Sequence, residues 1–404
     1  MRWGRMCLGV WLFLSSAGAA AAQRVDCHMV DEAMDTAVEI RRLRVKKSVP
    51  CELQGREQVE KYLRDTLNKK IPPERIANEG KVYELLGIIP PDFDYLNSII
   101  KLYTEQLGGY YDTDRAAYVM ASWLPGPMQM PIAVHELTHA LQDQHFNLDA
   151  MMDELHDDSD SLMARSGLVE GDATAVMLDY ARKMAGQGPI SREKDVAAFM
   201  LQNITGAMLT AGVSSAPPAL QAMLIFPYVS GLHFVHALLK TGGYEAVDKA
   251  FRRPPNSTEE ILHPEIYKKG TKSFEHPAMP PIPSGIEVNP KKPIFEDRLG
   301  EFVISTTLSV YLAPPRATVA ASGWGGDRLW LFKTAEGKKL LLWRLLWDAD
   351  KDAAEFFEAI VEAYTKRFSA PGSGEKVEER IFSNTPLGTV QIRRSVRTVD
   401  LAIY

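Results

Sequence analysis

Cysteine is scarce in this chain, which has three in 404 residues, and Cys7 lies in an apolar N-terminal segment. The other two, Cys27 and Cys51, are too few and too far apart for a cysteine-based zinc site or a disulfide-dense scaffold. They form an even pair, and in an oxidising compartment we expect a disulfide between them that ties the N-terminal segment to the first helix. Two buried free thiols are the alternative.

Long hydrophobic runs are missing beyond the N-terminus, since no later stretch reaches 18 uninterrupted apolar residues. Residues 1–22 have the organisation of a secretory signal peptide: Arg2 and Arg5 precede an apolar run from Cys7 to Phe13, and small residues end at Ala22. The apolar run is too short for a membrane anchor, the alternative reading. We therefore expect cleavage and an exported protein, periplasmic or extracellular, with no stable membrane insertion.

Blocks of like charge are absent, because the 46 basic and 52 acidic residues are interspersed. The formal net charge is -6, and loss of the two leader arginines would make it two units more negative. This distribution lacks the basic patch of a nucleic-acid-binding protein, so we expect no nucleic-acid partner. The roughly 380 residues that remain after cleavage are enough for a large core or two to three domains.

Histidine is sparse, with nine residues, yet two of them lie four apart in the sequence His135-Glu136-Leu137-Thr138-His139. On a helix, this HExxH pattern places two imidazoles on one face, where they can bind a single zinc ion, with Glu136 beside them. Pro131 suits the first turn of a helix, and no glycine or proline interrupts residues 132–146. The pattern therefore predicts a mid-helix zinc site and a zinc hydrolase.

A catalytic zinc normally has three protein ligands and one position for water, so a third ligand is expected downstream. We choose Glu170, which lies in a helical pattern that can pack antiparallel to the zinc helix. Its neighbours in Gly167–Thr174 are small or apolar, which favours a buried carboxylate over a solvated one. Asp172 and Asp179 are alternative ligands.

His145 competes for the same role, because it follows His139 by six residues, as in the metzincin motif. That motif needs a glycine to turn the chain, and this sequence has Gln142 there. If the helix continues, His145 is rotated by roughly 240° from His139 and faces away from the metal. We therefore interpret His145 as a histidine at the helix end.

The segment from His135 to Ala140, with Asp143 after it, resembles the active-site helix of the thermolysin-like gluzincins. The resemblance implies a Zn²⁺-dependent peptidase whose third ligand is a helical glutamate, here Glu170. It also implies that Glu136 is the general base, which takes a proton from the zinc-bound water. This chain departs from the family in a longer separation between His139 and Glu170. It also has Thr174 where those enzymes have an aspartate that supports a zinc-bound histidine.

Tyr228 to Gly231 is similar to the Tyr-x-x-Gly helix of aminopeptidase-type gluzincins. The likeness implies that the Tyr228 hydroxyl stabilises the tetrahedral oxyanion, and a plain core tyrosine is the alternative. His263 and His233 are further candidates for that donor, each with a structural role as the alternative. Five segments also look like a group of uncharacterised exported bacterial metallopeptidases: 107–112, 135–145, 170–173, 257–263 and 323–327.

The rest of the chain predicts an α+β protein. Amphipathic patterns predict helices at 57–70, 92–105 and over most of 155–252, with breaks at 186–189, 214–218 and 242–243. Residues 107–112 and 116–120 read as a hairpin before the zinc helix, whose free edge can pair with an extended peptide. A purely structural hairpin is the alternative. We interpret the sequon-like Asn256-Ser257-Thr258 as a helix cap after Pro254-Pro255.

Beyond residue 299 we expect a helical stretch to 322, a turn at 323–327, strands at 328–333 and 339–347, a helix at 350–368, and closing strands at 389–392 and 398–404. The domain prediction is therefore a signal peptide at 1–22 and a mostly helical zincin-like catalytic domain with a small upstream sheet at 23–275. A proline-rich linker or wrapping loop follows at 276–299, and an α+β C-terminal module at 300–404.

The expected function is an exported zinc-dependent peptidase that acts on a peptide or protein substrate. One alternative is a non-catalytic zinc-binding or scaffold protein that retains HExxH. Another is a zinc hydrolase of a non-peptide bond, because HExxH specifies the attacking water and not the substrate. The sequence does not set the cleaved bond, endo- or exopeptidase mode, or the oligomeric state.

Overall fold

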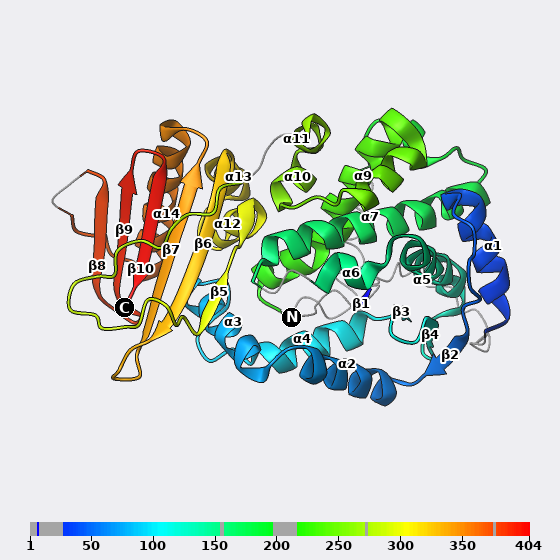
Figure 1. The fold of residues 1–404 in the computed structure, drawn as a ribbon, viewed down its shortest axis with the longest axis horizontal. Coiled ribbons are helices and arrows are strands. Elements are labelled where there is room, and N and C mark those ends of the chain that lie inside the picture. The colour runs from blue at the N-terminus through cyan, green and yellow to red at the C-terminus, as the bar shows by residue number, and fades with distance from the viewer. Residues whose placement is uncertain (1–5, 8–26, 154–156, 197–215, 271–273, 375–376) are drawn as a thin grey trace.

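The computed structural model of the chain describes residues 6–7, 27–153, 157–196, 216–270, 274–374 and 377–404. The predicted signal peptide lies outside these residues except for Met6–Cys7. The fold is α+β, as predicted. Figure 1 shows a mostly helical part with a small sheet beside a second part built on a larger sheet, which has helices against one face.

The helical part contains the first ten described α-helices and four short strands. They are β1 (Met6–Cys7), α1 (Val30–Arg41), β2 (Cys51–Gln54), α2 (Arg56–Lys70), α3 (Pro73–Leu86), α4 (Tyr95–Gln106), β3 (Gly109–Asp112), β4 (Ala117–Ala121), α5 (Gly126–Phe146), α6 (Leu148–Asp153), α7 (Ser159–Met184), α9 (Pro218–Arg252), α10 (Thr258–Leu262) and α11 (Pro264–Lys269). Short 3₁₀ helices occupy Cys27–Met29 and Ile190–Arg192. Part of the long predicted helical region, 154–156 and 197–215, lies outside the described residues.

The small sheet has the order β1-β3-β4-β2. Strands β3 and β4 form the predicted hairpin, with Tyr111 opposite Tyr118. Strand β2 runs parallel to β4 and was not predicted, because a four-residue segment gives only a short sequence pattern. The two residues of β1 pair antiparallel with the outer edge of β3, so an extended segment fits on that edge.

Helix α5 carries the HExxH motif at its centre, as predicted, but it begins earlier than expected. It starts at Gly126, with Pro127 in the first turn, so Pro131 lies inside the helix rather than at its start. Proline lacks an N–H, and its interior position therefore costs one helical hydrogen bond. The helix then continues unbroken to Phe146, and left-handed Asn147 ends it.

Helices α7 and α9 touch backbone to backbone at glycines. A Cβ built on Gly231 would lie 2.1 Å from the carbonyl oxygen of Gly167, and one built on Gly171 would lie 2.3 Å from the carbonyl carbon of Gly231. Only glycine permits this approach. The crossing brings Glu170 on α7 and Tyr228 on α9 to the same region of the fold, one helical turn or less from the contact.

Helix α9 is long and apolar enough to cross a membrane, the one such helix among the described residues. Its most apolar stretch is 44% buried within the protein, and it packs along α7. Buried core helices meet the same criteria of length and composition. Gly243 interrupts its helical backbone with a φ of 59°, close to the predicted break.

The larger sheet forms the second part, together with three helices. Its elements are β5 (Phe295–Asp297), α12 (Gly300–Ser309), α13 (Pro314–Ala321), β6 (Trp324–Lys333), β7 (Lys339–Trp347), α14 (Asp350–Phe368), β8 (Glu379–Thr385), β9 (Gly388–Ser395) and β10 (Thr398–Ile403). The strand order is β5-β6-β7-β10-β9-β8, and all neighbours are antiparallel.

Several expectations for this part are corrected. The segment 323–327 is not a turn, because β6 already begins at Trp324 and a bulge separates Trp324 from Gly326. The helical stretch 300–322 is divided into α12 and α13, with Pro314 in the first turn of the second helix. Strand β5 lies inside the predicted linker, and β8 was not predicted.

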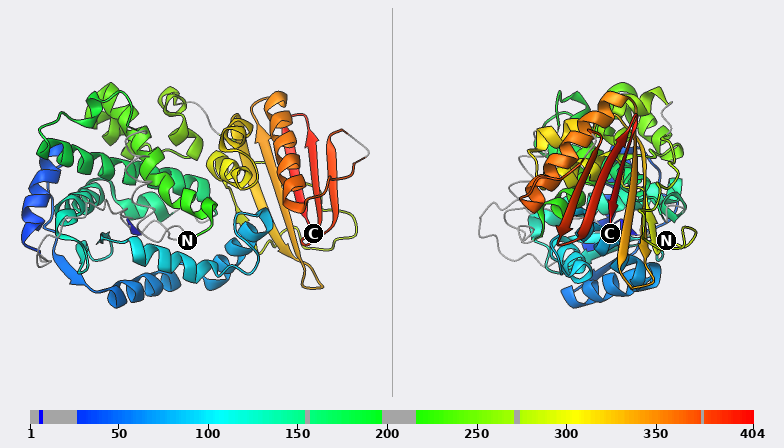
Figure 2. Two further views of the ribbon diagram at one scale, coloured as in Figure 1. Left: turned by 180° about the vertical axis from the view of Figure 1, so that it is seen from behind. Right: turned by 90° about the vertical axis from the view of Figure 1, so that its left-hand side faces the viewer.

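Each face of the larger sheet is covered. Helix α14 packs against one face, which Figure 2 shows from two directions, and buries Phe356 and Ile360 there. The proline-rich segment covers the other face, where Ile282 and Ile286 pack against strand residues such as Trp330. The segment 276–299 is therefore a wrapping loop with one strand.

Arg298 joins the two parts. Its buried guanidinium donates two hydrogen bonds to Asp158, which caps the N-terminus of α7, and a third to the carbonyl of Asn256. Asp327 of β6 accepts hydrogen bonds from the backbone N–H groups of Leu299 and Gly300. The larger sheet thus holds the start of the helix that carries Glu170.

Candidate metal centre

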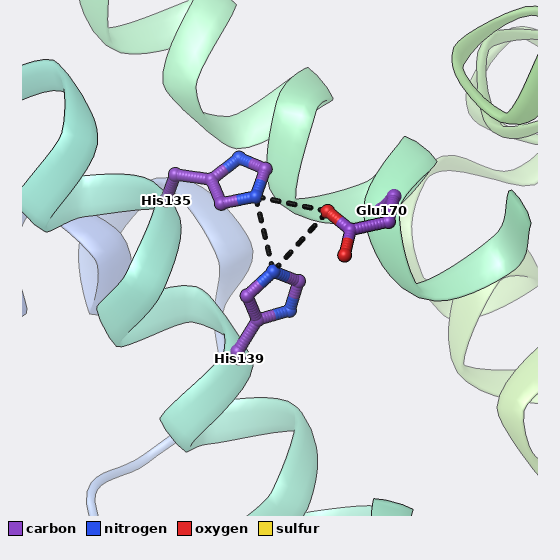
Figure 3. A group of neighbouring side chains, drawn as sticks. All are labelled: His135, His139 and Glu170. Atoms are coloured by element: carbon purple, nitrogen blue, oxygen red, sulfur yellow. Dashed lines mark hydrogen bonds and ion pairs between the residues drawn. The ribbon is translucent and has the colours of Figure 1, made fainter. Parts of the chain in front are cut away.

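Helices α5 and α7 bring His135, His139 and Glu170 together, and these residues form a group of potential metal ligands among the described residues. The two histidines lie one turn apart on the same face of α5, and the glutamate faces them from α7, as Figure 3 shows. Both imidazoles are fully buried. The predicted ligand set therefore converges in space.

The spacing of the three donors fits a tetrahedral metal. The two Nε2 atoms are 3.0 Å apart, and Oε2 of Glu170 lies 3.1 Å from Nε2 of His135 and 3.4 Å from Nε2 of His139. Ligands at typical zinc distances in tetrahedral geometry are separated by about 3.3 Å. Three donors at this spacing form one face of a coordination tetrahedron. Two imidazoles and one carboxylate can hold a divalent metal ion.

The charges of the three ligands are strongly coupled. Burial, with the proximity of His139, lowers the pKa of His135 to about 4 even though Glu170 opposes the shift. Burial also acts against protonated His139, but the adjacent carboxylate of Glu170 outweighs it and raises the His139 pKa to about 9. The pKa of Glu170 falls to about 2, because the two histidines outweigh its own burial. The Glu170 carboxylate is therefore ionised near neutral pH and can bind a cation.

His139 is oriented through its second ring nitrogen. Nδ1 of His139 donates to Oε1 of Gln142 at 2.8 Å, and Nε2 of Gln142 in turn donates to Oδ2 of Asp172 at 2.9 Å. Asp172 also accepts from Nε of Arg41 at 2.7 Å, and all four side chains are fully buried. Beside His135, the backbone of Ala173 opposes the lowering of the imidazole pKa. The contacts of His139 direct its Nε2 toward Glu170.

Glu136 is buried beside the metal group and faces the small sheet. Its Oε2 accepts a hydrogen bond from the backbone N–H of Tyr111 in β3, at 3.0 Å. That N–H belongs to the strand edge turned away from β4, so the carboxylate lies at the edge where β1 pairs. A general base at this edge can act on a bond in an extended chain bound there.

Two tyrosines lie near the metal group. The ring of Tyr228 lies 6.4 Å from that of His135, nearly parallel to it. The pKa of Tyr103, on α4, is raised to about 12 by burial and by the negative charge of Glu170. Tyr228 is thus near the site, as its predicted role requires, and its function as an oxyanion donor stays a prediction.

The other candidates lie in different surroundings. His145 donates to the carbonyl of Arg44, which agrees with its interpretation as a histidine at the helix end. Asp179 accepts from the backbone N–H of Ile190. His233 is exposed on α9, and His263 pairs with the buried Glu301 at 3.0 Å. The predicted catalytic role of His263 stays untested, and its pairing with Glu301 offers no support for it.

The disulfide between Cys27 and Cys51 is present, as predicted. It links the segment before α1 to the start of β2. Ser257 caps α10 by accepting from the N–H of Glu260, which confirms the helix-cap interpretation of that segment.

Sequence reasoning missed Gln142, Tyr103 and Arg41. Gln142 carried a usable signal, because it lies one turn after His139 on the same helix face. Arg41 and Tyr103 have no such signal, since their partners Asp172 and Glu170 are far away in the sequence.

Comparison with known families matches residues 291–402 to the model described as Domain of unknown function (DUF8575). This match covers the larger sheet with its helices and the end of the wrapping loop, and it does not include the metal group. No curated protein and no solved structure matches the chain.

Proposed function

We propose that this chain is an exported zinc-dependent peptidase of the gluzincin type, which hydrolyses peptide bonds in a peptide or protein substrate. One observation carries the proposal: the buried carboxylate of Glu136 lies beside two imidazoles and the carboxylate of Glu170, at spacings that suit one metal ion. Structural zinc normally has four protein ligands, whereas a set of two histidines and one glutamate leaves a position for water. The set of three ligands therefore favours a catalytic zinc site over a structural one.

Zinc in such a site supplies Lewis acidity and lowers the pKa of bound water toward neutrality. Glu136 accepts the proton of the attacking water and passes it to the leaving amine. The hydrogen bond from the N–H of Tyr111 holds the carboxylate in place for this transfer. Tyr228 donates to the negative charge that develops on the carbonyl oxygen, a contact worth about 10²- to 10³-fold in rate in other enzymes.

The edge of β3 aligns the substrate in this proposal. Removal of the leader would release the two β1 residues from that edge and expose its hydrogen-bonding groups to another extended segment. A peptide added there lies next to Glu136. The disulfide supports an oxidising compartment, which together with the leader pattern favours export.

The decisive experiment compares the exported, purified protein with its Glu136→Gln variant on a mixed peptide library. Cleavage that a chelator abolishes, that added zinc restores and that the variant lacks supports the proposal. Zinc binding without cleavage of any peptide favours a scaffold protein. Metal-dependent hydrolysis of esters or other non-peptide bonds, with peptides untouched, favours the second alternative.

A further inference from the structure

A second site adjoins the metal group, a cavity of about 180 Å³ between helices α3, α4, α7 and α9. We name it the Glu79 pocket, because Glu79 is the charged side chain among the described residues that line it. The remaining lining is mostly aliphatic or aromatic and includes Ile99, Leu102, Leu162, Met163, Met223 and Leu224.

One end of the Glu79 pocket lies near the metal group, although His135, His139 and Glu170 do not line it. Ser166 lines the pocket and precedes Glu170 by one turn on the same face of α7. Pro227 lines it and directly precedes Tyr228. Tyr103 also lines the pocket, and the negative charge of Glu170 contributes to the raised pKa of its phenol. A substrate bound at the metal group therefore has this pocket beside the bond to be cleaved.

The other end is formed by Glu79 together with Tyr83, Tyr95 and Ser159. Tyr95 and Tyr103 are eight residues apart on α4, which corresponds to about 12 Å along the helix. An extended lysine side chain spans about 6 Å from Cα to Nζ, and the remaining distance leaves room for the substrate backbone at the metal group. The pocket thus suits a long, unbranched side chain.

The Glu79 end of the pocket is acidic. Glu79 and the buried Asp297 interact with each other and with Arg75, whose guanidinium is 3.9 Å from the Asp297 carboxylate. Burial and the neighbouring Asp297 raise the pKa of Glu79 to about 7, although Arg75 opposes the shift. Burial also raises the pKa of Asp297 to about 6. Because raised pKa values disfavour the ionised carboxyl groups, a cationic side chain bound beside Glu79 would stabilise its ionised form.

The Glu79 carboxyl is held in one orientation. The Tyr83 hydroxyl donates to its Oε1 at 3.2 Å, and the Tyr95 hydroxyl also bonds to it. A carboxylate has about four acceptor positions, so a cationic donor can bind in addition to two phenols. Such a charge-assisted bond is strong in an apolar pocket.

We propose that the Glu79 pocket binds a lysine or arginine side chain of the substrate next to the cleaved bond, with Glu79 as its counter-ion. The apolar walls contact the aliphatic stem of that side chain, and the carboxyl at the end pairs with its charge. The inference rests on the proposed peptidase function, and it adds the class of substrate that the site selects.

The test uses the full exported protein with zinc and two peptides that differ only in lysine against norleucine at the position next to the cleaved bond, chosen from library cleavage maps. We expect lysine or arginine to be enriched at that position. Glu79→Gln, which keeps the size of the side chain, should lower kcat/KM for the lysine peptide by at least about tenfold and leave the norleucine peptide nearly unchanged. Glu74→Gln, exposed on the same helix, is the matched control.

A binding measurement separates the two proposals. In the Glu136→Gln background, titration calorimetry should show tighter binding of the lysine peptide than of the norleucine peptide, and Glu79→Gln should remove the difference. Cleavage without preference for a basic residue, or equal binding of the two peptides, would overturn the Glu79 pocket inference and leave the peptidase proposal intact. Preferential binding of the lysine peptide without any cleavage would keep the pocket and overturn the peptidase proposal.

Discussion

Nδ1 of His139 lies 2.8 Å from Oε1 of Gln142, so the histidine that completes HExxH is oriented by a glutamine of its own helix. Gln142 in turn donates a hydrogen bond to Asp172, which also accepts one from Arg41 at the end of α1. Arg41 is also paired with Asp248 of α9 at 2.7 Å. A buried polar chain therefore links the metal group to the N-terminal helix.

From this series of buried hydrogen bonds we predict that a substitution at Gln142 weakens metal binding. Gln142→Leu removes the acceptor that keeps the proton on Nδ1 of His139, and we expect about 10- to 100-fold weaker zinc binding with the fold retained. Competition titration with a chromophoric chelator measures the affinity. Gln187→Leu, an exposed glutamine, is the control and should bind as the wild type does. Unchanged affinity in Gln142→Leu would mean that the hydrogen bond has no role in metal binding.

Substitution of the proposed metal ligands should lower zinc binding more than substitution of Gln142 does. We expect one zinc per chain in the exported protein, nearly complete loss in His139→Ala and marked loss in Glu170→Ala, because two donors rarely hold zinc tightly. Elemental analysis of the purified variants provides the stoichiometry. Full zinc content in Glu170→Ala together with loss in His145→Ala would transfer the role of third ligand and contradict the gluzincin assignment.

Glu136→Gln should separate binding from catalysis. The amide cannot accept a proton, so we expect turnover to fall by about 10²- to 10⁴-fold, while zinc content and melting temperature stay near those of the wild type. Peptide hydrolysis and elemental analysis on the same preparation test both parts. Retained turnover would exclude Glu136 as the base.

Tyr228→Phe should lower kcat more than it raises KM, because the hydroxyl is proposed to bond only to charge that appears in the transition state. Steady-state kinetics on one good peptide distinguishes the two effects. Equal turnover of Tyr228→Phe and the wild type would show that the Tyr228 hydroxyl does not act in catalysis and that the residue serves only in packing.

Gly231→Ala should destabilise the protein by about 2 kcal/mol or more, because its Cβ would lie 2.1 Å from the carbonyl oxygen of Gly167 and would force α7 and α9 apart. Gly188→Ala is the control, since its Cβ would meet only the flexible side chain of Arg192 at 3.3 Å. Chemical denaturation of the two variants gives the comparison. Similar stability of both would show that the helices can separate without cost.

Local periodicity was sufficient to predict the HExxH helix and its three functional residues, because their relative positions follow from 3.6 residues per turn. Helix α14 was predicted to the residue for the same reason, since caps and amphipathic spacing are local signals. Strands β2 and β8 were missed because their partners, not their own residues, make them strands. The segment 323–327 was mistaken for a turn because its glycines serve a bulge within β6.

The sequence by itself determined the helix that carries HExxH, the α+β class, the cysteine pair and, through small and apolar neighbours, the choice of Glu170 as candidate ligand. Only the tertiary structure decided that Glu170 faces the histidines, that Gln142 and Asp172 support them, and that Glu79 closes a pocket beside them. The reason is physical: a helix sets which residues share its face, but the glycine contact between α7 and α9 and the packing of α3 and α4 set which faces meet.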